Sequence, residues 1–340
     1  MHSINRQIRL KNRPAAEELI KPENFELIYQ TLPKLSHGEV LLRVLYIGLA
    51  SSSRTWLHEK QPYGSRIAIG DVMRGTAIGR VVASRSSGFV EGELVQGPLG
   101  WQDYALLHER QTRGYIKYPS ESPATSLTNI LGACGTNGLI AHAGVTWAAP
   151  KPGECVVVTS AAGAIGSIAG QIAKIYGARV VGITNGTNKC QYLIDDLGFD
   201  AVVDYRTEHW QQKLEAATPN GINVSFESVG GSVMRAVLSR MSVGGRVALS
   251  GIMPVYDTSK DHGSDFSMVI AKQLTLRGVS AYADPNPEMA TKLLTEWILD
   301  GRLKLRETIV EGLEQAPDTL SRMLNGRSNN MVGRIFIHVS

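Results

Sequence analysis

The sequence lacks the features that mark disulfide-rich, zinc-stapled and membrane-spanning proteins. Only three cysteines occur in 340 residues, and no two of them form a C-x-x-C pair. A disulfide framework or a structural zinc site is therefore not expected. No apolar run approaches the length of about 18 residues that suggests a membrane span, and the polar N-terminal segment does not resemble a signal peptide. These absences predict a cytoplasmic protein with no membrane partner.

The chain also has no large excess of positive or negative side chains. The 35 lysines and arginines nearly balance 31 aspartates and glutamates, and the basic residues form no block along the chain. Nucleic acid is therefore not an expected partner. Hydrophobic residues make up 43% of the sequence, which is typical of a packed globular protein, and 340 residues exceed what one core usually supports. Two domains are the expectation.

The most informative feature that is present is a strand followed by a turn of small residues. A β-branched run at 155–159 leads into the sequence Ser-Ala-Ala-Gly-Ala-Ile-Gly, and a helical stretch begins at once. Uncovered backbone N–H groups and the partial positive charge of a helix N-terminus suit such a turn to a pyrophosphate. Another predicted strand at 179–183 completes a βαβ unit of about 30 residues. For the small residues alone, a role in tight packing stays open.

The pattern of elements changes near residue 125. Before it, short strands separated by glycines predict a compact β-rich module; after it, strands alternate with helices, which indicates a parallel sheet covered on both faces. We predict a β-rich segment at 1–125, a nucleotide-binding segment at 126–305 and a segment at 306–340 that returns to the first. In the nucleotide-binding segment the expected strands are 155–159, 179–183, 201–204, 224–229, 245–250 and 274–279, and the expected helices include 165–176, 189–197, 232–240 and 287–300.

The end of the second strand of this βαβ unit predicts which nicotinamide cofactor is bound. In NAD-type sites an acidic residue about 20 residues past the glycines binds the ribose hydroxyls, but residues 183–189 contain no carboxylate. Without that acid a 2′-phosphate is not repelled, and Lys189 can pair with it as a point charge. The sequence therefore predicts NADPH. The alternative is that Lys189 is an ordinary solvated lysine.

Several motifs together resemble one family. They are the turn at 161–166, Phe-Glu-Ser-Val-Gly-Gly at 226–231 and Gly-Gly-Arg-Val-Ala at 244–248, and the likeness runs nearly end to end. The chain resembles the zinc-independent medium-chain dehydrogenase/reductase family, in the branch of leukotriene B4 12-hydroxydehydrogenase/prostaglandin, 2-alkenal and curcumin reductases. This resemblance implies an α/β fold with a Rossmann-type doubly wound parallel sheet plus a GroES-like β-rich substrate domain. It also implies a homodimer that uses NADPH to reduce the C=C bond of an α,β-unsaturated ketone or aldehyde.

The resemblance further implies a set of cofactor-binding residues. Those expected at the pyrophosphate are Gly163, Ala164, Ile165 and Gly166; at the 2′-phosphate, Lys189 and Tyr205; along the nicotinamide, Ser250, Gly251, Ile252 and Tyr256; at the carboxamide, the backbone of Val279, Ser280 and Ala281; and at further local contacts, Ser228 and Asn330. The chain departs from the family at Ser228, which replaces an asparagine, and at 329–334, where the longer segment leaves the choice of Asn330 open.

Reduction of a conjugated double bond places negative charge on the carbonyl oxygen, which calls for a hydrogen-bond donor. Tyr256 is the first candidate, because a phenol stays protonated at neutral pH. Ser52 is the second; it stands where the family has an active-site tyrosine. The alternatives are that Tyr256 only lines the pocket and that Ser52 only serves a turn.

Two other functions stay open at this stage. A metal-free carbonyl or quinone reductase would need a similar donor, and a non-catalytic NADPH-binding protein would keep the cofactor turn while losing the substrate chemistry. A zinc-dependent dehydrogenase is disfavoured, because no cysteine lies in the β-rich segment and the histidines are isolated. No metal ligands are therefore predicted.

Overall fold

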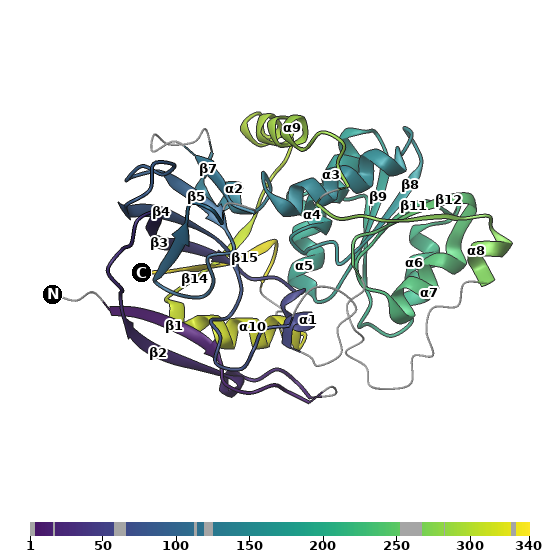
Figure 1. Cartoon of the computed structure of the whole chain (residues 1–340). Helices are drawn as coiled ribbons and strands as arrows, with labels where there is room; N and C mark the ends of the chain where they lie inside the picture. The colour runs from purple at the N-terminus through teal and green to yellow at the C-terminus, as the bar shows by residue number, and fades with distance from the viewer. Residues whose placement is uncertain are drawn as a thin grey trace. The chain divides into compact units, whose positions relative to one another are not determined.

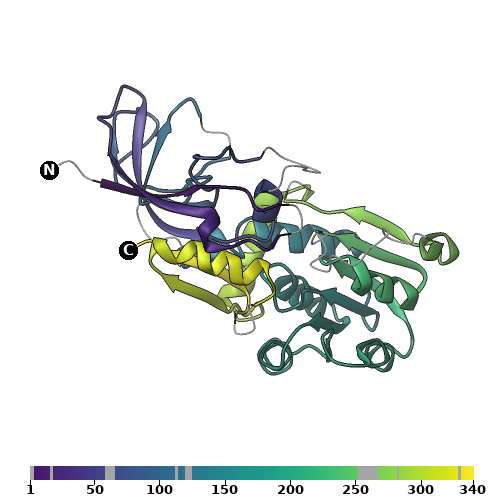
Figure 2. The same cartoon turned by 90° about the horizontal axis from the view of Figure 1, so that it is seen from below.

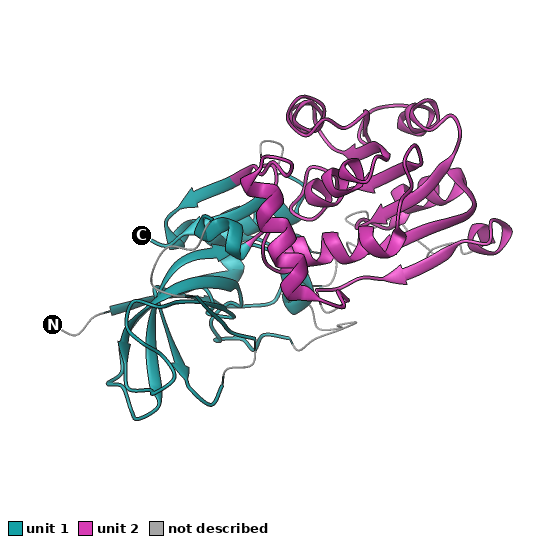
Figure 3. Cartoon of the chain, turned by 90° about the horizontal axis from the view of Figure 1, so that it is seen from above, with its two compact units in different colours: residues 1–131, 308–328, 334–340 teal, residues 132–307, 329–333 magenta. Residues whose placement is uncertain are grey.

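The computed structural model describes residues 4–15, 18–57, 66–111, 114–118, 125–251, 267–281, 283–327 and 331–340. They form two compact units, shown in different colours in Figure 3. Unit 1 comprises residues 1–131, 308–328 and 334–340, and unit 2 comprises residues 132–307 and 329–333. Unit 1 therefore contains segments from both ends of the chain.

Unit 2 is built on a six-stranded sheet in which all neighbouring pairs with a recorded register are parallel. The strand order is β10-β9-β8-β11-β12-β13, so the order reverses between β8 and β11. This is the Rossmann arrangement, which binds dinucleotides beyond the carboxyl ends of the strands at that reversal. The strands are β8 (Cys155–Thr159), β9 (Arg179–Thr184), β10 (Ala201–Asp204), β11 (Ile222–Glu227), β12 (Met241–Leu249) and β13 (Thr275–Gly278).

Helices cover both faces of this sheet, as Figure 1 shows for α3 and α4 on one side and α6 and α7 on the other. Successive side chains of each strand point to opposite faces of the sheet. In β8, Val156 and Val158 face one core, while Cys155 and Val157 face the other. The helices are α3 (Thr136–Ala148), α4 (Gly166–Ile175), α5 (Thr187–Gln191), α6 (Trp210–Ala217), α7 (Gly231–Arg240), α8 (Ser267–Ala271) and α9 (Pro287–Leu299).

The helices of unit 2 differ from the sequence-based expectations in two places. The single helix expected at 189–197 is a short α-helix, α5, followed by a π-helical turn at Tyr192–Asp196. Helix α3 was not predicted, because its sequence Thr-Asn-Gly-Leu-Ile-Ala-His-Ala-Gly-Val-Thr-Trp-Ala has no amphipathic stripe. Its small residues allow close packing: a Cβ at Gly144 would lie 2.5 Å from the ring of Phe226. A helix buried on several sides carries no polar face for a sequence pattern to reveal.

Unit 1 contains a two-stranded antiparallel ribbon and a seven-stranded sheet in the order β14-β15-β3-β4-β5-β7, with β6 also paired to β3. The short glycine-separated strands predicted for this region are confirmed at β3, β4 and β5. The strands are β1 (Ile4–Leu10), β2 (Phe25–Thr31), β3 (Glu39–Gly48), β4 (Thr76–Ser84), β5 (Leu94–Gly97), β6 (Tyr104–His108), β7 (Ile116–Tyr118), β14 (Glu307–Glu311) and β15 (Arg334–His338), and the helices are α1 (Ser53–Leu57), α2 (Leu127–Leu131) and α10 (Ala316–Leu324).

The end of the chain packs onto its beginning within unit 1. Strand β15 pairs antiparallel with β3, with Ile337 opposite Ile47. Helix α10, yellow in Figure 2, lies beside the N-terminal segment, where the Ser321 hydroxyl donates a 2.7 Å hydrogen bond to the carbonyl of Ile20. Ile20 is fully buried. These contacts hold the C-terminal strand to the sheet of unit 1 and the C-terminal helix to the segment around Ile20, in both cases across some 300 positions of the sequence.

Candidate cofactor site

The small-residue turn after β8 is shaped so tightly that glycine is required at its end. Ser160 has a φ of 51°, and the Gly163 N–H donates a 2.9 Å hydrogen bond back to the Ser160 carbonyl. A Cβ at Gly166 would lie 2.5 Å from that same carbonyl oxygen, and a Cβ at Gly163 would lie 3.0 Å from the Ser160 hydroxyl. Gly166 therefore lets α4 start directly against the end of β8. This is the close strand–helix packing that dinucleotide turns use.

The turn is open on its outer side. Gly163, Ala164 and Ile165 are partly exposed, whereas Gly166 is buried. The Ser167 and Ala169 N–H groups at the start of α4 donate hydrogen bonds to the carbonyls of Gly163 (3.0 Å) and Ile165 (2.9 Å), so the turn runs directly into the first turn of the helix, whose N-terminus carries a partial positive charge. An anion such as a pyrophosphate fits this geometry. The four residues predicted at the pyrophosphate thus form one continuous turn at the carboxyl end of β8.

The segment after β9 buries a positive charge. Lys189, in α5, is 8% exposed, and its Nζ donates a 3.2 Å hydrogen bond to Oδ1 of the buried Asn185. Burial lowers the pKa of Lys189, and the nearby Arg206 lowers it further. The alternative interpretation of Lys189 as a solvated lysine is therefore wrong. Tyr205, the other residue predicted at the 2′-phosphate, is half-buried at the end of β10, and its N–H bonds to the carbonyl of Thr184 at 3.1 Å.

The carboxyl ends of β11 and β12 carry uncharged hydroxyls. Ser228 follows β11 and Ser250 follows β12, and their Oγ atoms are 2.6 Å apart. The Ser228 N–H also donates a 2.8 Å hydrogen bond to the Thr159 hydroxyl at the end of β8. Gly251 comes next in the chain and is partly exposed. Ser228, Ser250 and Gly251, predicted from separate motifs, therefore lie together at the reversal of strand order.

A further predicted residue lies at the carboxyl end of β13. Val279 follows β13, is buried, and donates its N–H to the Leu249 carbonyl at 2.8 Å. Ser280 and Ala281 lead on from it, and a 3.0 Å hydrogen bond from the Ala283 N–H to the Ser280 carbonyl closes a turn there. The backbone expected at the carboxamide thus continues the same edge of the sheet.

A buried carboxyl group at the carboxyl end of β11 was not predicted from the sequence. Glu227, the last residue of β11, is fully buried, and its Oε1 accepts hydrogen bonds from the N–H groups of Val229 (2.7 Å) and Gly230 (2.8 Å). Oε2 has no hydrogen-bond partner among the described residues. Burial raises the pKa of Glu227, against the lowering effect of the two N–H groups. The sequence signal that could have identified Glu227 is a charged residue at the end of a predicted strand, directly before Ser-Val-Gly-Gly.

The remaining predicted residues fall in two other places. Ile252, Tyr256 and Asn330 lie outside the described residues. Ser52, in unit 1, is exposed in the turn before α1, where its carbonyl accepts hydrogen bonds from both the N–H and the hydroxyl of Thr55. The structure therefore shows a turn role for the backbone of Ser52, and its catalytic role stays a prediction.

The described residues show no gathering of three or more histidine, cysteine, aspartate or glutamate side chains that could hold a metal ion. His142 instead pairs through Nδ1 with the buried Asp284 at 2.6 Å. None of the helices that the structure describes combines the length and apolar character needed to span a membrane.

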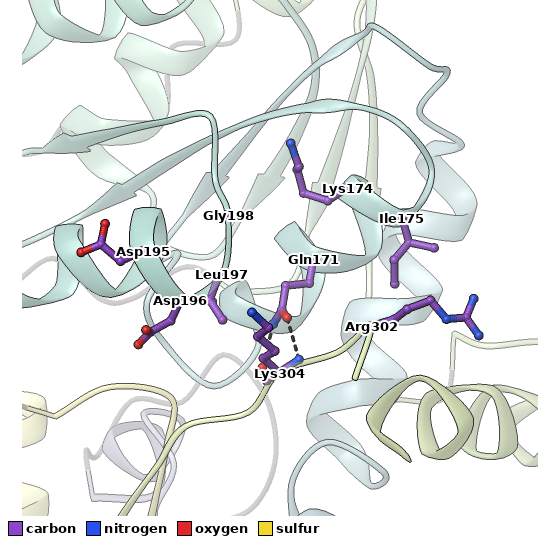
Figure 4. A pocket seen from close by; sticks show the side chains of 9 residues that line it. All are labelled: Gln171, Lys174, Ile175, Asp195, Asp196, Leu197, Gly198, Arg302 and Lys304. Carbon is purple, nitrogen blue, oxygen red and sulfur yellow. Dashed lines mark hydrogen bonds between the residues drawn. The ribbon is translucent and has the colours of Figure 1, made fainter. Parts of the chain in front are cut away.

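A pocket of about 320 Å³ opens elsewhere in unit 2 (Figure 4). It is lined by the second half of α4, the turn before β10 and the segment around Lys304, so it lies toward the amino ends of the strands. Gln171 closes one wall, because its side chain hydrogen-bonds both the N–H and the carbonyl of Lys304. This pocket is therefore separate from the residues at the carboxyl ends of β8 to β13, which we call the cofactor edge.

Comparison with known proteins places this architecture in a family. Residues 6–114 match a family model described as "N-terminal domain of oxidoreductase", and residues 164–298 match one described as "Zinc-binding dehydrogenase". The chain is 32% identical to the NADPH-dependent curcumin reductase of Escherichia coli, over 99% of this chain and 97% of that protein. The chain belongs to the zinc-independent medium-chain dehydrogenase/reductase family. The family predicted from the motifs is thereby confirmed.

Two further relatives agree with this family assignment. Prostaglandin reductase 1 of Mus musculus is 34% identical over 90% of this chain and 92% of its own length. The crystal structure of CurA from Vibrio vulnificus in complex with NADPH superposes with a TM-score of 0.90 at 32% identity, covering 98% of this chain and 99% of that chain. The predicted fold class is confirmed, and this member of the medium-chain reductases is an NADPH-dependent oxidoreductase.

Proposed function

We propose that this medium-chain reductase uses NADPH to reduce the C=C bond of an α,β-unsaturated ketone or aldehyde. The observation that carries the proposal is the combination of the dinucleotide turn after β8 with the buried Lys189 in α5, the helix that follows β9. A glycine whose Cβ would meet backbone at 2.5 Å and a lysine that is 8% exposed fit a phosphorylated dinucleotide. The named relatives, a curcumin reductase and a prostaglandin reductase, support the substrate class.

Different residues of unit 2 would bind different parts of the cofactor. The turn at 163–166 would bind the pyrophosphate through backbone N–H groups, while Lys189 and Tyr205 would hold the 2′-phosphate. Ser228, Ser250 and the segment 279–281 would position the nicotinamide. When bound, NADPH supplies the hydride that adds to the β carbon of the conjugated carbonyl.

Tyr256 would donate a hydrogen bond to the carbonyl oxygen as negative charge develops there, and Ser52 is the second candidate for this role. A phenol keeps its proton at neutral pH, so it can stabilise the enolate of the substrate without first being charged. Because the donor acts most strongly in the transition state, its loss should lower kcat more than it changes cofactor binding.

The test is an NADPH-oxidation screen of conjugated ketones, aldehydes and quinones, with mass detection of products. A saturated ketone or aldehyde supports the proposal, and an allylic alcohol supports a carbonyl reductase instead. No oxidation across the panel, with NADPH still bound in a fluorescence titration, would indicate a cofactor-binding protein without catalysis.

The donor is tested by Tyr256→Phe, which we expect to lower kcat by about 10- to 100-fold with little change in NADPH affinity. Tyr205→Phe removes a phenol expected at the 2′-phosphate and is the matched control: it should weaken NADPH binding and leave kcat nearly unchanged. Full turnover in Tyr256→Phe would remove this tyrosine from the mechanism.

The expectations of a homodimer and of a cytoplasmic location both stay predictions. Sedimentation of the purified chain with and without NADPH tests the first, and cell fractionation of a tagged chain tests the second.

A further inference from the structure

A second cation lies next to Lys189. Arg206 is exposed and follows β10, whereas Lys189 follows β9; the two strands are neighbours in the parallel sheet, with Asp204 in register with Thr184. The two positive groups are close enough that Arg206 contributes to the lowered pKa of Lys189. Like charges brought together at a partly dehydrated site repel each other, and a bound dianion relieves that repulsion.

Asp204 joins the two loops that carry these cations. Its Oδ2 accepts a 2.8 Å hydrogen bond from the N–H of Gly186, after β9, and its Oδ1 accepts a 3.0 Å hydrogen bond from the N–H of Arg206. Its main-chain carbonyl also accepts hydrogen bonds from the N–H and the hydroxyl of Thr207. One carboxylate thus fixes the spacing between the loop before Lys189 and the loop that begins at Arg206.

This arrangement differs from an NAD site, although both have a carboxylate at the edge of the sheet. The acidic residue of an NAD site follows the second strand and binds the ribose hydroxyls. Asp204 ends the third strand instead, and both of its oxygens already accept backbone N–H groups. Asp204 therefore joins the two loops through their backbone N–H groups, a role different from the ribose contact of the acidic residue in an NAD site.

We propose that Arg206 is a second specificity-determining cation for the adenosine 2′-phosphate, and that Asp204 is the positioning residue that holds Arg206 and Lys189 at the same phosphate. This inference rests on the proposed use of NADPH and adds residues that the sequence did not assign. The buried Lys189 supplies a fixed charge, and the guanidinium of Arg206 can bind two phosphate oxygens at once. The ligand class is a ribose 2′-phosphomonoester.

The experiment measures binding of two probes to the full chain by calorimetry. Adenosine 2′,5′-bisphosphate carries the 2′-phosphate, and adenosine 5′-monophosphate lacks it. We expect Arg206→Gln to weaken the bisphosphate about tenfold and to leave the monophosphate unchanged. Arg206→Lys should recover part of the loss, because it keeps a charge without the planar fork. Arg302→Gln, which removes an exposed arginine of unit 2 that lines the pocket of Figure 4, is the matched control.

Asp204→Asn tests the positioning role. It removes one acceptor while keeping the size of the side chain, so we expect the ratio of bisphosphate to monophosphate affinity to fall about threefold. A purely structural role would weaken both probes equally and leave that ratio unchanged, which would overturn this part of the inference.

The outcomes separate the inference from the proposed function. If the unmodified chain prefers the bisphosphate and oxidises NADPH with enones, but Arg206→Gln binds the bisphosphate as tightly, the role of Arg206 is wrong and the function stands. If the unmodified chain does not prefer the bisphosphate, the NADPH site itself is wrongly placed and the inference falls with it.

Discussion

The two ends of the cofactor edge in unit 2 differ in charge. At the β9–β10 end the edge carries Lys189 and Arg206, whereas at the β11–β12 end it carries the hydroxyls of Ser228 and Ser250 above the buried Glu227. A charged end suits a phosphate, and a neutral hydroxyl end suits an uncharged ring and its amide. Under the proposed function, this difference would orient the asymmetric dinucleotide, with electrostatic attraction holding the phosphate end and hydrogen bonds holding the nicotinamide end.

The largest expected effect comes from blocking the turn that joins the two ends. Gly166→Val places carbon atoms against the Ser160 carbonyl, where even a Cβ would lie at 2.5 Å. We expect the free energy of unfolding to fall by about 3 kcal/mol and NADPH binding to be lost. Denaturant unfolding and NADPH fluorescence measure the two effects. Gly88→Ala is the control, because the nearest atom to its Cβ is 3.6 Å away; equal behaviour of both variants would contradict the packing argument.

The charged end is tested by Lys189→Ala. Loss of the charge-assisted contact should reduce NADPH affinity by about 1–2 kcal/mol and leave NADH affinity nearly the same. Kd values for both cofactors, measured by fluorescence titration, give the comparison. Lys213→Ala removes an exposed lysine of α6, whose Nζ bonds to the Thr207 hydroxyl, and serves as the control. An intact chain that binds or uses NADH as well as NADPH would contradict the charge assignment.

The neutral end is tested by Glu227→Gln as a function of pH. Because burial raises the pKa of Glu227 above its ordinary 4.5, the folded chain keeps this proton at pH values where the unfolded chain has released it. The contribution of the protonated carboxyl to stability is complete below pH 4.5 and is lost as the pH rises through the raised pKa. The free energy of unfolding of Glu227→Gln should therefore exceed that of the unmodified chain by a margin that grows to about 1 kcal/mol as the pH rises.

The control for this pH series is Glu208→Gln, which removes a carboxylate whose side chain is 87% exposed. A difference between the unmodified chain and Glu227→Gln that stays constant from acid to neutral pH would show that Glu227 is charged in the folded chain.

The smallest expected effect comes from Ser228→Ala, which breaks the hydroxyl pair with Ser250. A single neutral hydrogen bond contributes about 0.5 kcal/mol, so NADPH affinity should fall about two- to threefold. Ser239→Ala, which removes an exposed hydroxyl of α7 bonded to its own helix, is the matched control. A loss as large as that of Lys189→Ala would mean that the two ends contribute equally and that the contrast between them is wrong.

The local patterns of the sequence were good guides to the strands of unit 2. Residues 155–159 and 201–204 were predicted with the bounds that β8 and β10 have, because each is a short β-branched run next to turn residues. Strands β1 and β2 were not predicted, although their register joins Gln7 to Ile28. In β1 the polar Asn5 and Gln7 are buried while Ile4 is exposed, so the hydrophobic alternation that marks a half-buried strand is broken.

The residues of the candidate site also differ in whether the sequence could predict them. Gly163, Gly166 and Lys189 could be predicted because a motif and a missing acid mark them in one stretch of sequence. Glu227 and Asp204 could not be assigned, because their roles depend on burial and on backbone N–H groups that face them only in the folded chain. The roles of Tyr256, Ser52 and Asn330 stay predictions.

By itself the sequence determined the alternation of strands and helices, the phosphate turn and the absence of an acid at 183–189, because each of these depends on residues that are neighbours in the chain. Only the tertiary structure decided that Asp204 would hold two loops together, that Lys189 would be buried beside Arg206, and that Glu227 would lose contact with water. The physical reason is that burial and electrostatic coupling arise between segments that the sheet brings side by side, and no local pattern records which segments those are.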